Sequence, residues 1–334
     1  MIAGVLTPTE QTLFAELVQQ VTTAPVAGSV YARERDGIEY YYAKIQVGVE
    51  RTDTFIGKIG DPQAESRVES LKRGMRLAQE RRRLVSMLRR TGLATPPRTV
   101  GATLDALAHA GLFKSGAVLV GTTAYMMSEP LVGRTLPAPT LMTGDLDLVT
   151  TNLALQSEPP ERLEAILKRG DPTFEPVLQI DPRQPSSRFR TADGFLLDLI
   201  TPIRRRSDKT PMPLDSLDAG AAPLQNIDWL IANPVLTVAL WGSGVAVNVP
   251  QPARFAAQKL ILAQKRDAGS RMKRQKDLLQ ANALIDALLA NDPYSLIDTL
   301  VDACGQGSKG WAQPLERSLK ELARKDILEQ IAAA

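Results

Sequence analysis

Three aspartates interrupt short apolar runs, and this pattern restricts the fold more than any other feature of the chain. Asp145 and Asp147 alternate with apolar residues in "TGDLDLVT", and Asp198 lies inside "GFLLDLITP". Residues two apart on a strand point to the same side, so the first two carboxylates face together while Leu146 and Leu148 face a core. Neighbouring carboxylates repel each other, and burying one without a partner is costly. The pattern therefore predicts strands whose aspartates share bound metal ions.

The few metal-binding and nucleophilic side chains narrow the chemistry. The 334 residues include one histidine, His109, and one cysteine, Cys304. These numbers exclude a histidine-rich metal site, a multi-cysteine zinc site and an internal disulfide. The sequence also has no nucleophile elbow, no Gly-x-Gly-x-x-Gly run and no P-loop. Carboxylate oxygens favour Mg²⁺ or Mn²⁺, which are the expected cofactors.

A glycine–threonine turn precedes the aspartates along the chain. The run "GAVLVG" at 116–121 has strand length, and the helical pattern "TTAYMMSEPL" follows it directly. A strand, a tight turn and a helix N-terminus bring backbone amides close to phosphates. Gly121, Thr122 and Thr123 are therefore predicted to bind the triphosphate of an NTP. Two metal ions on the aspartates would activate an attacking hydroxyl and stabilise the leaving pyrophosphate.

These motifs resemble a known superfamily. In order, "LVGTTAY", "GDLDL" and "LLDLITP" match the three motifs of the polymerase-beta-like nucleotidyltransferases. The chain is similar to a bacterial branch related to abortive-infection nucleotidyltransferase toxins, which shares "LAQERRRLVSMLRRTGL" and "PQPARFAAQKLILAQKR". The resemblance covers most of residues 28–290. It departs from the superfamily in having Gly-Thr at the first turn and 22 residues between Thr122 and Asp145, a longer spacing than usual.

The resemblance implies an α/β (α+β) fold and an activity. The fold is a mixed sheet with flanking helices, a small N-terminal β module and a helical C-terminal domain. The activity is transfer of an NMP from ATP or another NTP to a hydroxyl or phosphate acceptor, with release of pyrophosphate. Asp145 and Asp147 would hold both metal ions, and Asp198 would share one and help to deprotonate the acceptor.

The toxin branch adds two further residues. From "QKLILAQKR" and "RQKDLLQA", the resemblance implies that Lys259 contacts the nucleotide phosphates and that Asp277 stabilises this lysine or the bound nucleotide. From the residues alone, Lys259 is equally well explained as a lysine that packs its stem on a buried helix.

Three arginines follow the third aspartate along the chain: Arg204, Arg205 and Arg206. Their position favours contact with substrate phosphate over an ordinary basic loop.

The periodicities divide the chain into four segments. We expect a helix over 1–24, short strands over 28–60 with a hairpin turn at Asp36-Gly37, a hairpin over 235–249, and a helix starting at Pro252. The expected segments are an N-terminal helix with an aromatic and basic β module (1–61), a basic connecting helix (62–92), the nucleotidyltransferase domain (93–250) and a helical C-terminal domain (251–334).

Basic residues are concentrated in the connecting helix, although the whole chain is nearly neutral, with 40 basic and 37 acidic residues. An apolar stripe, interrupted at Arg82, should pack inward. A one-sign surface is typical of RNA or DNA binding, but a connector packed on acidic neighbours fits equally well. The basic residues of this segment, 67–90, are Arg67, Lys72, Arg73, Arg76, Arg81, Arg82, Arg83, Arg89 and Arg90.

The β module is also aromatic and basic, with Tyr40–Tyr42 beside Arg33 and Lys44. A small sheet docked on a neighbour explains this composition better than nucleic-acid contact, because aromatic residues favour strands in general.

The acceptor and the biological role stay open at this stage. RNA or tRNA is the preferred acceptor because of the 67–90 helix. The alternatives are a catalytically silent nucleic-acid-binding protein on the same fold and a nucleotidyltransferase that modifies a small hydroxylated molecule such as an antibiotic. No long apolar run or signal peptide is present, so no membrane contact and a cytoplasmic location are expected, with a toxin–antitoxin role implied only by resemblance. Whether the chain has a protein partner is left open.

Overall fold

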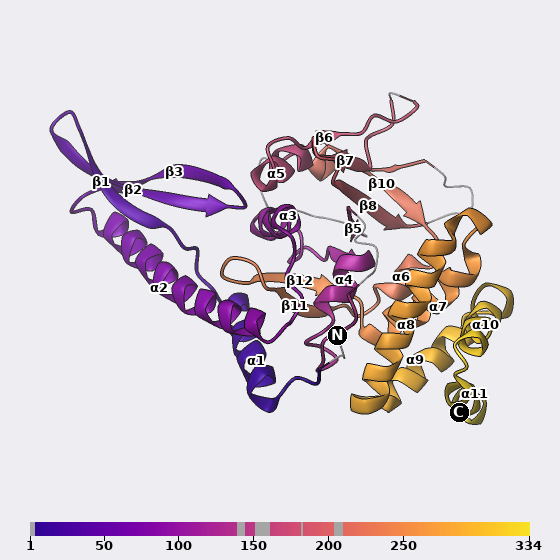
Figure 1. Cartoon of the computed structure of the whole chain (residues 1–334). Coiled ribbons are helices and arrows are strands. Elements are labelled where there is room, and N and C mark those ends of the chain that lie inside the picture. Colours follow the sequence, from indigo (N-terminus) through magenta and orange to yellow (C-terminus); the bar gives the residue numbers. More distant parts are fainter. Residues whose placement is uncertain (1–3, 139–143, 151–160, 182, 204–209) are drawn as a thin grey trace.

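A mixed sheet of seven strands forms the centre of the molecule (Figure 1). The computed structural model describes residues 4–138, 144–150, 161–181, 183–203 and 210–334. The strand order is β4-β5-β8-β10-β9, with β7 pairing to β8 and β6 to β7. The pairs β5–β8 and β8–β10 are parallel and the others are antiparallel. The strands are β4 (Val118–Val120), β5 (Asp145–Val149), β6 (Glu175–Pro176), β7 (Arg188–Arg190), β8 (Leu196–Pro202), β9 (Met212–Leu214) and β10 (Ala219–Leu224).

One face of this sheet is closed by helices, as the alternating sequence requires. Leu146 and Leu148 of β5 and Leu197 and Leu199 of β8 are fully buried. They share one hydrophobic core with the apolar sides of α3 (Arg98–His109) and α5 (Leu163–Gly170), which pack against each other. Burying each leucine contributes about 1.5–3 kcal/mol relative to exposure. The predicted mixed α/β fold is confirmed, and the closed face leaves the aspartates on the opposite side.

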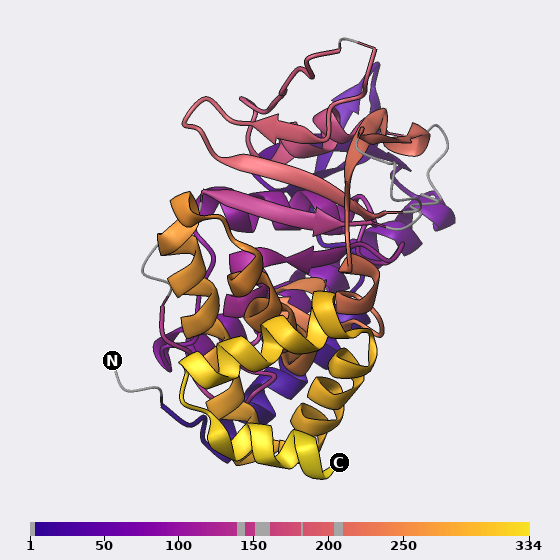
Figure 2. The ribbon, with the colours of Figure 1, turned by 90° about the vertical axis from the view of Figure 1, so that its right-hand side faces the viewer.

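The C-terminal helices continue the same core (Figure 2). Pro252 starts α7 in the first turn, where a proline costs no hydrogen bond, as predicted. The apolar core crosses the predicted boundary at residue 250 without a break, and the proposed division into segments remains a prediction. The helices are α4 (Gly121–Met127), α6 (Ile227–Leu230), α7 (Pro252–Lys265), α8 (Arg271–Asn291), α9 (Pro293–Gly305), α10 (Gln313–Glu321) and α11 (Lys325–Ala333).

A separate hairpin, β11 (Val235–Ala239) and β12 (Val245–Val249), joins two cores. Its residues Val245 and Val247 belong to the central core. Val238 belongs instead to a second cluster with Phe14 and Leu17 of α1 (Pro8–Thr22). The hairpin at 235–249 was predicted correctly, and it anchors the N-terminal helix to the rest of the molecule.

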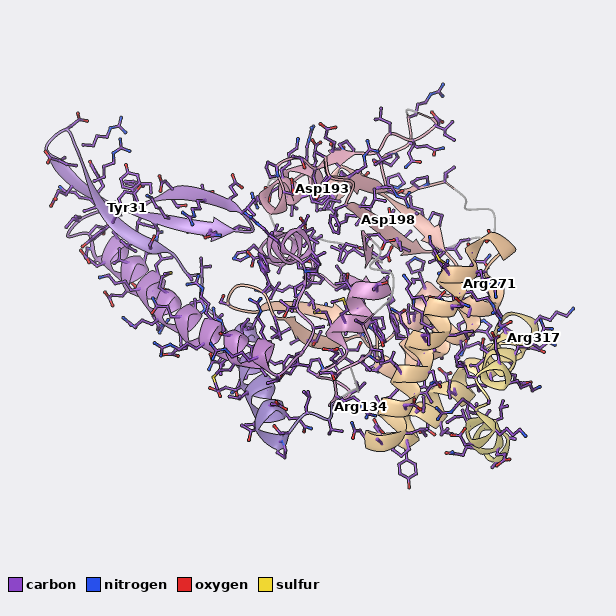
Figure 3. The ribbon with its side chains drawn as sticks, in the orientation of Figure 1. Tyr31, Arg134, Asp193, Asp198, Arg271 and Arg317 are labelled. Carbon is purple, nitrogen blue, oxygen red and sulfur yellow. The ribbon has the colours of Figure 1, made fainter. Side chains whose placement is uncertain are left out.

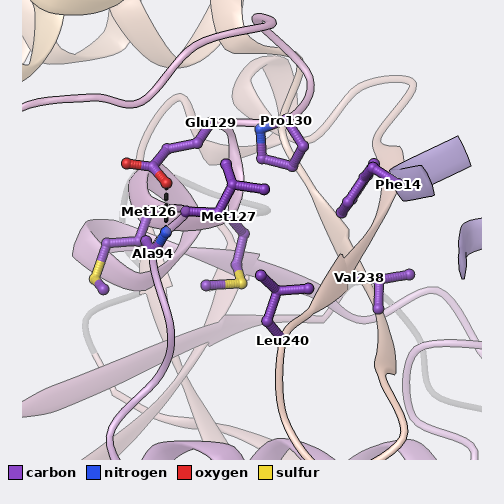
Figure 4. A pocket seen from close by; sticks show the side chains of 9 residues that line it. Phe14, Ala94, Met126, Met127, Glu129, Pro130, Val238 and Leu240 are labelled. Carbon is purple, nitrogen blue, oxygen red and sulfur yellow. Dashed lines mark hydrogen bonds between the residues drawn. The ribbon is translucent and has the colours of Figure 1, made fainter. Parts of the chain in front are cut away.

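A small pocket lies at the seam between these cores, and Figure 4 shows the residues that line it. The buried carboxylate of Glu129 accepts hydrogen bonds from the backbone N–H groups of Ala94 (2.5 Å) and Leu136 (2.9 Å). The remaining cavity, beside Phe14 and Leu240, is only about 10 Å³. That volume is close to the minimum for a single water, so the seam offers no ligand site.

The N-terminal arm, which we define as β1 (Ser29–Arg35), β2 (Ile38–Val47), β3 (Glu50–Lys58) and α2 (Pro62–Arg90), projects from one end of the molecule (Figure 1). Its three strands form an antiparallel sheet. Asp36 and Gly37 at the first hairpin turn have φ of 53° and 72°, as expected for an Asp-Gly turn. The sheet's inner face packs on α2 through Ala43 and Ile56.

One residue in α2 was assigned wrongly from the sequence. The buried stripe of the helix contains Arg81, with 5% exposed area, whereas Arg82 is exposed. The spacing from Ala78 to Arg81 to Val85 follows the three-four repeat of a buried helical face. Arg81 Nε donates a hydrogen bond to the backbone oxygen of Ser243, 3.2 Å away, in the turn of the β11–β12 hairpin. Arg81 therefore anchors the arm and is not part of its basic surface.

Across the described ranges, no helix combines the length and the apolar character needed to span a membrane.

Candidate active site

The sheet brings the three aspartates together on its open face. Strands β5 and β8 run parallel, with Asp147 directly opposite Asp198. Asp145 and Asp147 are partly exposed, and they alternate with buried leucines along β5. Asp198 alternates in the same way along β8, where Figure 3 labels it. The alternation predicted from the sequence thus places three carboxylates on one side of two adjacent strands.

The glycine–threonine turn contacts the middle aspartate. Val120, the last residue of β4, pairs with Asp147 across the antiparallel ladder. Gly121 has φ of +71°, and a Cβ at this position would lie 2.2 Å from Asp147 Oδ2. Only glycine satisfies both the backbone angle and this close approach. The unusual 22-residue spacing between Thr122 and Asp145 therefore does not separate the turn from the carboxylates.

Asp147 has a strongly raised pKa because of its position in the cluster. Burial, first, and the charges of Asp145 and Asp198 together raise the pKa of Asp147 to about 6, although the charges of Lys259 and Lys276 act in the opposite direction. An additional positive charge near Asp147 would favour its ionised form. The electrostatics of this face are therefore suited to a cation.

Lys276 of α8 is a site residue that the sequence interpretation missed. Its side chain has 7% exposed area, and its Nζ lies 3.2 Å from Thr122 Oγ1 in the turn. Burial lowers the pKa of Lys276, as does the charge of Lys259, while Asp145 raises it. Thr122 and Thr123 are themselves buried, each with 8% exposed area. Lys276 thus links the C-terminal helices to the predicted phosphate-binding turn.

Lys259 and Asp277 form a buried ion pair. Lys259 Nζ lies 2.8 Å from Asp277 Oδ1, and Arg266 Nε lies 3.0 Å from Asp277 Oδ2. Asp277 is fully buried, and Lys259 has 8% exposed area. The ammonium group also lies 5.2 Å from the centre of the Phe255 ring. Asp277 therefore positions two cations on α7 and the segment that follows it, which agrees with a stabilising role for this aspartate.

Arg188 of β7 is the second missed residue. Its Nε and Nη2 atoms lie 2.5 Å and 2.7 Å from the two carboxylate oxygens of Asp198, a bidentate pair. This pairing is the main reason that the pKa of Arg188 is raised. The side chain of Arg188 is half exposed, whereas that of Asp198 is 19% exposed. Both oxygens of the third carboxylate are thus engaged by a cation that belongs to the protein.

The donor set suits a hard divalent cation, although no metal cluster is preformed. Within the described ranges, no three His, Cys, Asp or Glu side chains are grouped as ready metal ligands. Asp145 and Asp147 offer adjacent carboxylates on one face, whereas Asp198, beside them on β8, is paired with Arg188. Carboxylate oxygens are the ligands that Mg²⁺ and Mn²⁺ prefer.

The substrate contact predicted for Arg204, Arg205 and Arg206 concerns residues outside the described ranges.

Sequence signals for the missed residues were present but weak. Lys276 stands directly before Asp277 in "RQKDLLQA", and it falls on the buried side of α8 together with Gln280. Arg188 belongs to the alternating strand pattern "SRFR", ten residues before Asp198. Neither pattern alone says which side chain an arginine or lysine meets, because the partner comes from a distant element.

Comparison with known proteins agrees with this geometry. A family model described as "Nucleotidyltransferase" matches residues 98–305, which include the three aspartates, the turn, Lys259 and Lys276. No curated protein and no solved structure matches the chain significantly. The match does not distinguish the branch related to abortive-infection toxins, which stays a prediction. It covers more than half of the chain, so the protein belongs to the nucleotidyltransferase family and is a transferase of nucleotidyl groups.

Proposed function

We propose that the protein transfers an NMP from an NTP to a hydroxyl group of RNA in a metal-dependent reaction. The acceptor oxygen attacks the α-phosphorus, the bond from this phosphorus to the bridging oxygen breaks, and pyrophosphate leaves with that oxygen. The proton of the hydroxyl passes to Asp198. The observation that carries the proposal is the convergence of Asp145, Asp147 and Asp198 with the Gly121 turn on one face of the sheet.

Two lysines would neutralise the triphosphate. Lys276 contacts the turn at Thr122, and Lys259 acts electrostatically on Asp147. Charge grows on the β- and γ-phosphates as pyrophosphate leaves, so fixed cations stabilise the transition state more than the ground state. Helix α4 has only seven residues, so we assign more of this stabilisation to the lysines than to the helix N-terminus.

Asp145, Asp147 and Asp198 would hold Mg²⁺ or Mn²⁺. When bound, the ion supplies Lewis-acid activation of the acceptor hydroxyl and charge neutralisation at the phosphates. In the structure, the carboxylate of Asp198 is paired with Arg188.

RNA is the preferred acceptor because of the N-terminal arm. Eight of the nine basic residues between 67 and 90 are exposed, and Arg81 is the exception. The acidic residues of the same helix neutralise few of them; Lys72 with Glu69 is one exposed pair. A polyanion gains affinity from such a surface by releasing counterions.

The cytoplasm is the proposed compartment. A toxin role follows only from the resemblance to the branch related to abortive-infection toxins.

A small hydroxylated molecule is the second candidate acceptor. A cavity of about 410 Å³ opens beside Asp198, lined in part by Ser187, Arg188, Ile200 and Leu224. This volume lies in the range of small-molecule sites. The cavity is next to the proposed base, so it can take either a free molecule or the reacting end of a polymer.

Incubation with each of the four labelled NTPs, Mg²⁺ and total RNA tests the proposal. Label should enter RNA with one NTP or a subset, and Asp145→Asn should remove the incorporation. Label that appears only in small molecules would favour the second acceptor. No incorporation into either pool by the folded protein would contradict the proposed reaction.

A further inference from the structure

The sheet of the N-terminal arm has an outer face that the proposed reaction does not use. Residues paired across antiparallel strands point to the same side, and the side alternates along each strand. Tyr31 pairs with Tyr42, and Tyr42 pairs with Phe55. Tyr40 pairs with Arg33 and Lys58 in the neighbouring row. These two rows lie on the face opposite to Ala43, which is buried against α2.

Four aromatic rings gather on this outer face, which we call the aromatic face: Tyr31, Tyr40, Tyr42 and Phe55. The ring centres of Tyr31 and Tyr42 are 5.8 Å apart in a stacked arrangement. Phe55 lies 5.7 Å from Tyr40 and 5.5 Å from Tyr42. Phe55 is 56% exposed, and the three tyrosines are partly exposed. The rings contact one another, and each of them keeps part of its surface open to solvent.

The charges on the same face are almost all positive. Lys44 pairs with Asp53 in the strand register, and Gln46 pairs with Arg51. Lys44 Nζ lies 5.3 Å from the centre of the Tyr31 ring. At the register positions of this face within the described strands, Asp53 is the single carboxylate. The exposed cations are Arg33, Arg35, Lys44, Arg51 and Lys58.

The expectation that the β module is simply docked on a neighbour accounts for one face only. The inner face has that role, since Ala43 and Ile56 pack against Val68 and Leu71 of α2. Strand propensity explains aromatic residues in general, but it does not explain why they collect on the exposed side with cations between them. A cluster of solvent-accessible aromatic side chains is a candidate binding surface.

We propose that the aromatic face binds single-stranded RNA, with bases stacking on the rings and the surrounding cations contacting phosphates. Rings interleaved with basic residues are the combination that single-stranded nucleic acid requires. A duplex keeps its bases stacked internally and cannot use the rings. The choice of RNA rests on the proposed function, in which RNA is the acceptor. The arm lies at one end of the molecule, well separated from Asp198 in Figure 3, so it would hold a part of the RNA remote from the reacting hydroxyl.

Fluorescence anisotropy with a labelled single-stranded RNA of about 12 nucleotides, a length within the site sizes of single-strand-binding folds, tests the proposal against the same RNA as a duplex. The variants are Phe55→Leu and Tyr31→Leu, which keep an apolar side chain but remove the ring. Each should weaken single-strand binding by roughly fivefold to a hundredfold, the scale of one base stack, and leave its salt dependence unchanged. Lys44→Gln and Arg51→Gln should instead lower the salt slope by about 0.7 for each phosphate that the variant no longer neutralises.

Tyr294→Leu is the matched control, because Tyr294 is 83% exposed but lies on α9, outside the arm. Wild-type affinity in both ring variants, or equal affinity for the duplex and the single strand, would overturn the proposal. Single-strand binding without nucleotidyl transfer would leave the aromatic face standing and remove the proposed function. Transfer to acceptors without any single-strand binding would do the opposite. Far-ultraviolet circular dichroism and thermal melts of each variant confirm that the arm is folded.

Discussion

The candidate active site and the N-terminal arm both carry many charged side chains but arrange them in opposite ways. At the candidate active site, charges of both signs are in contact, in the buried pair Lys259–Asp277 and in the partly exposed pair Arg188–Asp198. On the arm, the charges are exposed and mostly positive. Buried pairs have a fixed geometry and suit a small ligand such as a triphosphate. Exposed charges of one sign suit an extended polyanion whose register is not fixed.

The largest expected effect is at the sheet. Asp147→Asn should reduce nucleotidyl transfer by roughly three orders of magnitude or more, since it removes a ligand and a charge from the proposed metal site. Transfer is measured with radiolabelled NTP under saturating Mg²⁺. Asp228→Asn, an exposed aspartate on α6, is the control and should keep wild-type activity. Full activity of Asp147→Asn would show that the chemistry occurs elsewhere.

The two lysines should give the next largest effect. Lys276→Met and Lys259→Met each keep most of the stem and remove the charge, so transfer should fall by roughly two orders of magnitude. Steady-state kinetics with varied NTP measures this decrease. Lys265→Met, at the exposed end of α7, is the control. Equal decreases in all three variants would mean that Lys259 and Lys276 do not act specifically on the phosphates.

Variants that change charges on the arm should weaken RNA binding without affecting the binding of the NTP. The double variant Arg82→Glu, Arg83→Glu should weaken RNA binding and lower the salt slope by about 0.7–0.9 for each phosphate left without its cation. Binding of a fluorescent NTP analogue should be unchanged. Arg81→Met tests the buried neighbour and should keep the slope, because this side chain bonds Ser243 and not solvent. An unchanged slope in the double variant would make α2 a structural connector.

Arg188 belongs to the candidate active site but is half exposed, so it is intermediate between the buried charges of the site and the exposed charges of the arm. Arg188→Met frees both oxygens of Asp198, so Mn²⁺ should bind roughly fivefold more tightly, the scale of a partly exposed ion pair. Binding is followed by the electron paramagnetic resonance signal of free Mn²⁺. Arg190→Met, exposed on the same strand, should change the affinity little. Unchanged or weaker binding in Arg188→Met would exclude competition between the guanidinium and the cation.

The smallest expected effect is on stability. The pKa of Asp147 is raised in the folded protein to about 6 from 3.8. The folded state is therefore favoured by protonation, and this contribution is present below about pH 4 and is lost as the pH rises through 6. Asp147→Asn should be more stable than wild type at pH 8 by about 1–3 kcal/mol, and equally stable at pH 4. Urea unfolding in the presence of EDTA measures both values. A gain in stability of Asp147→Asn that does not depend on pH would contradict a raised pKa of Asp147 in the folded protein.

Sequence periodicity was sufficient for the elements whose apolar faces alternate strictly. Asp145, Asp147 and Asp198 could be placed on one face because each lies between apolar residues, and the hairpin at Asp36-Gly37 follows from its turn chemistry. These features depend on local pattern alone. The contact between Gly121 and Asp147 was not predicted, because it depends on the pairing of β4 with β5.

The rest depends on packing between distant segments. Lys276 reaches Thr122 across 154 positions, and Arg81 reaches Ser243 across 162. Nothing in the local sequence of either residue names its partner. The prediction that Arg82 interrupts the buried stripe failed for the same reason: the stripe holds Arg81 instead, whose Nε donates to a carbonyl of another element. The aromatic face became apparent only when strand register showed which side the rings occupy.

The measurement that tests the central claim most directly compares two labels in one reaction. The protein is incubated with RNA, Mg²⁺ and the preferred NTP, labelled in parallel at the α- or the γ-phosphate. Transfer at the three aspartates predicts that the α-label enters RNA, that the γ-label appears in pyrophosphate in equal amount, and that Asp147→Asn abolishes both. Entry of the γ-label into RNA, or equal incorporation by Asp147→Asn, would contradict nucleotidyl transfer at this site.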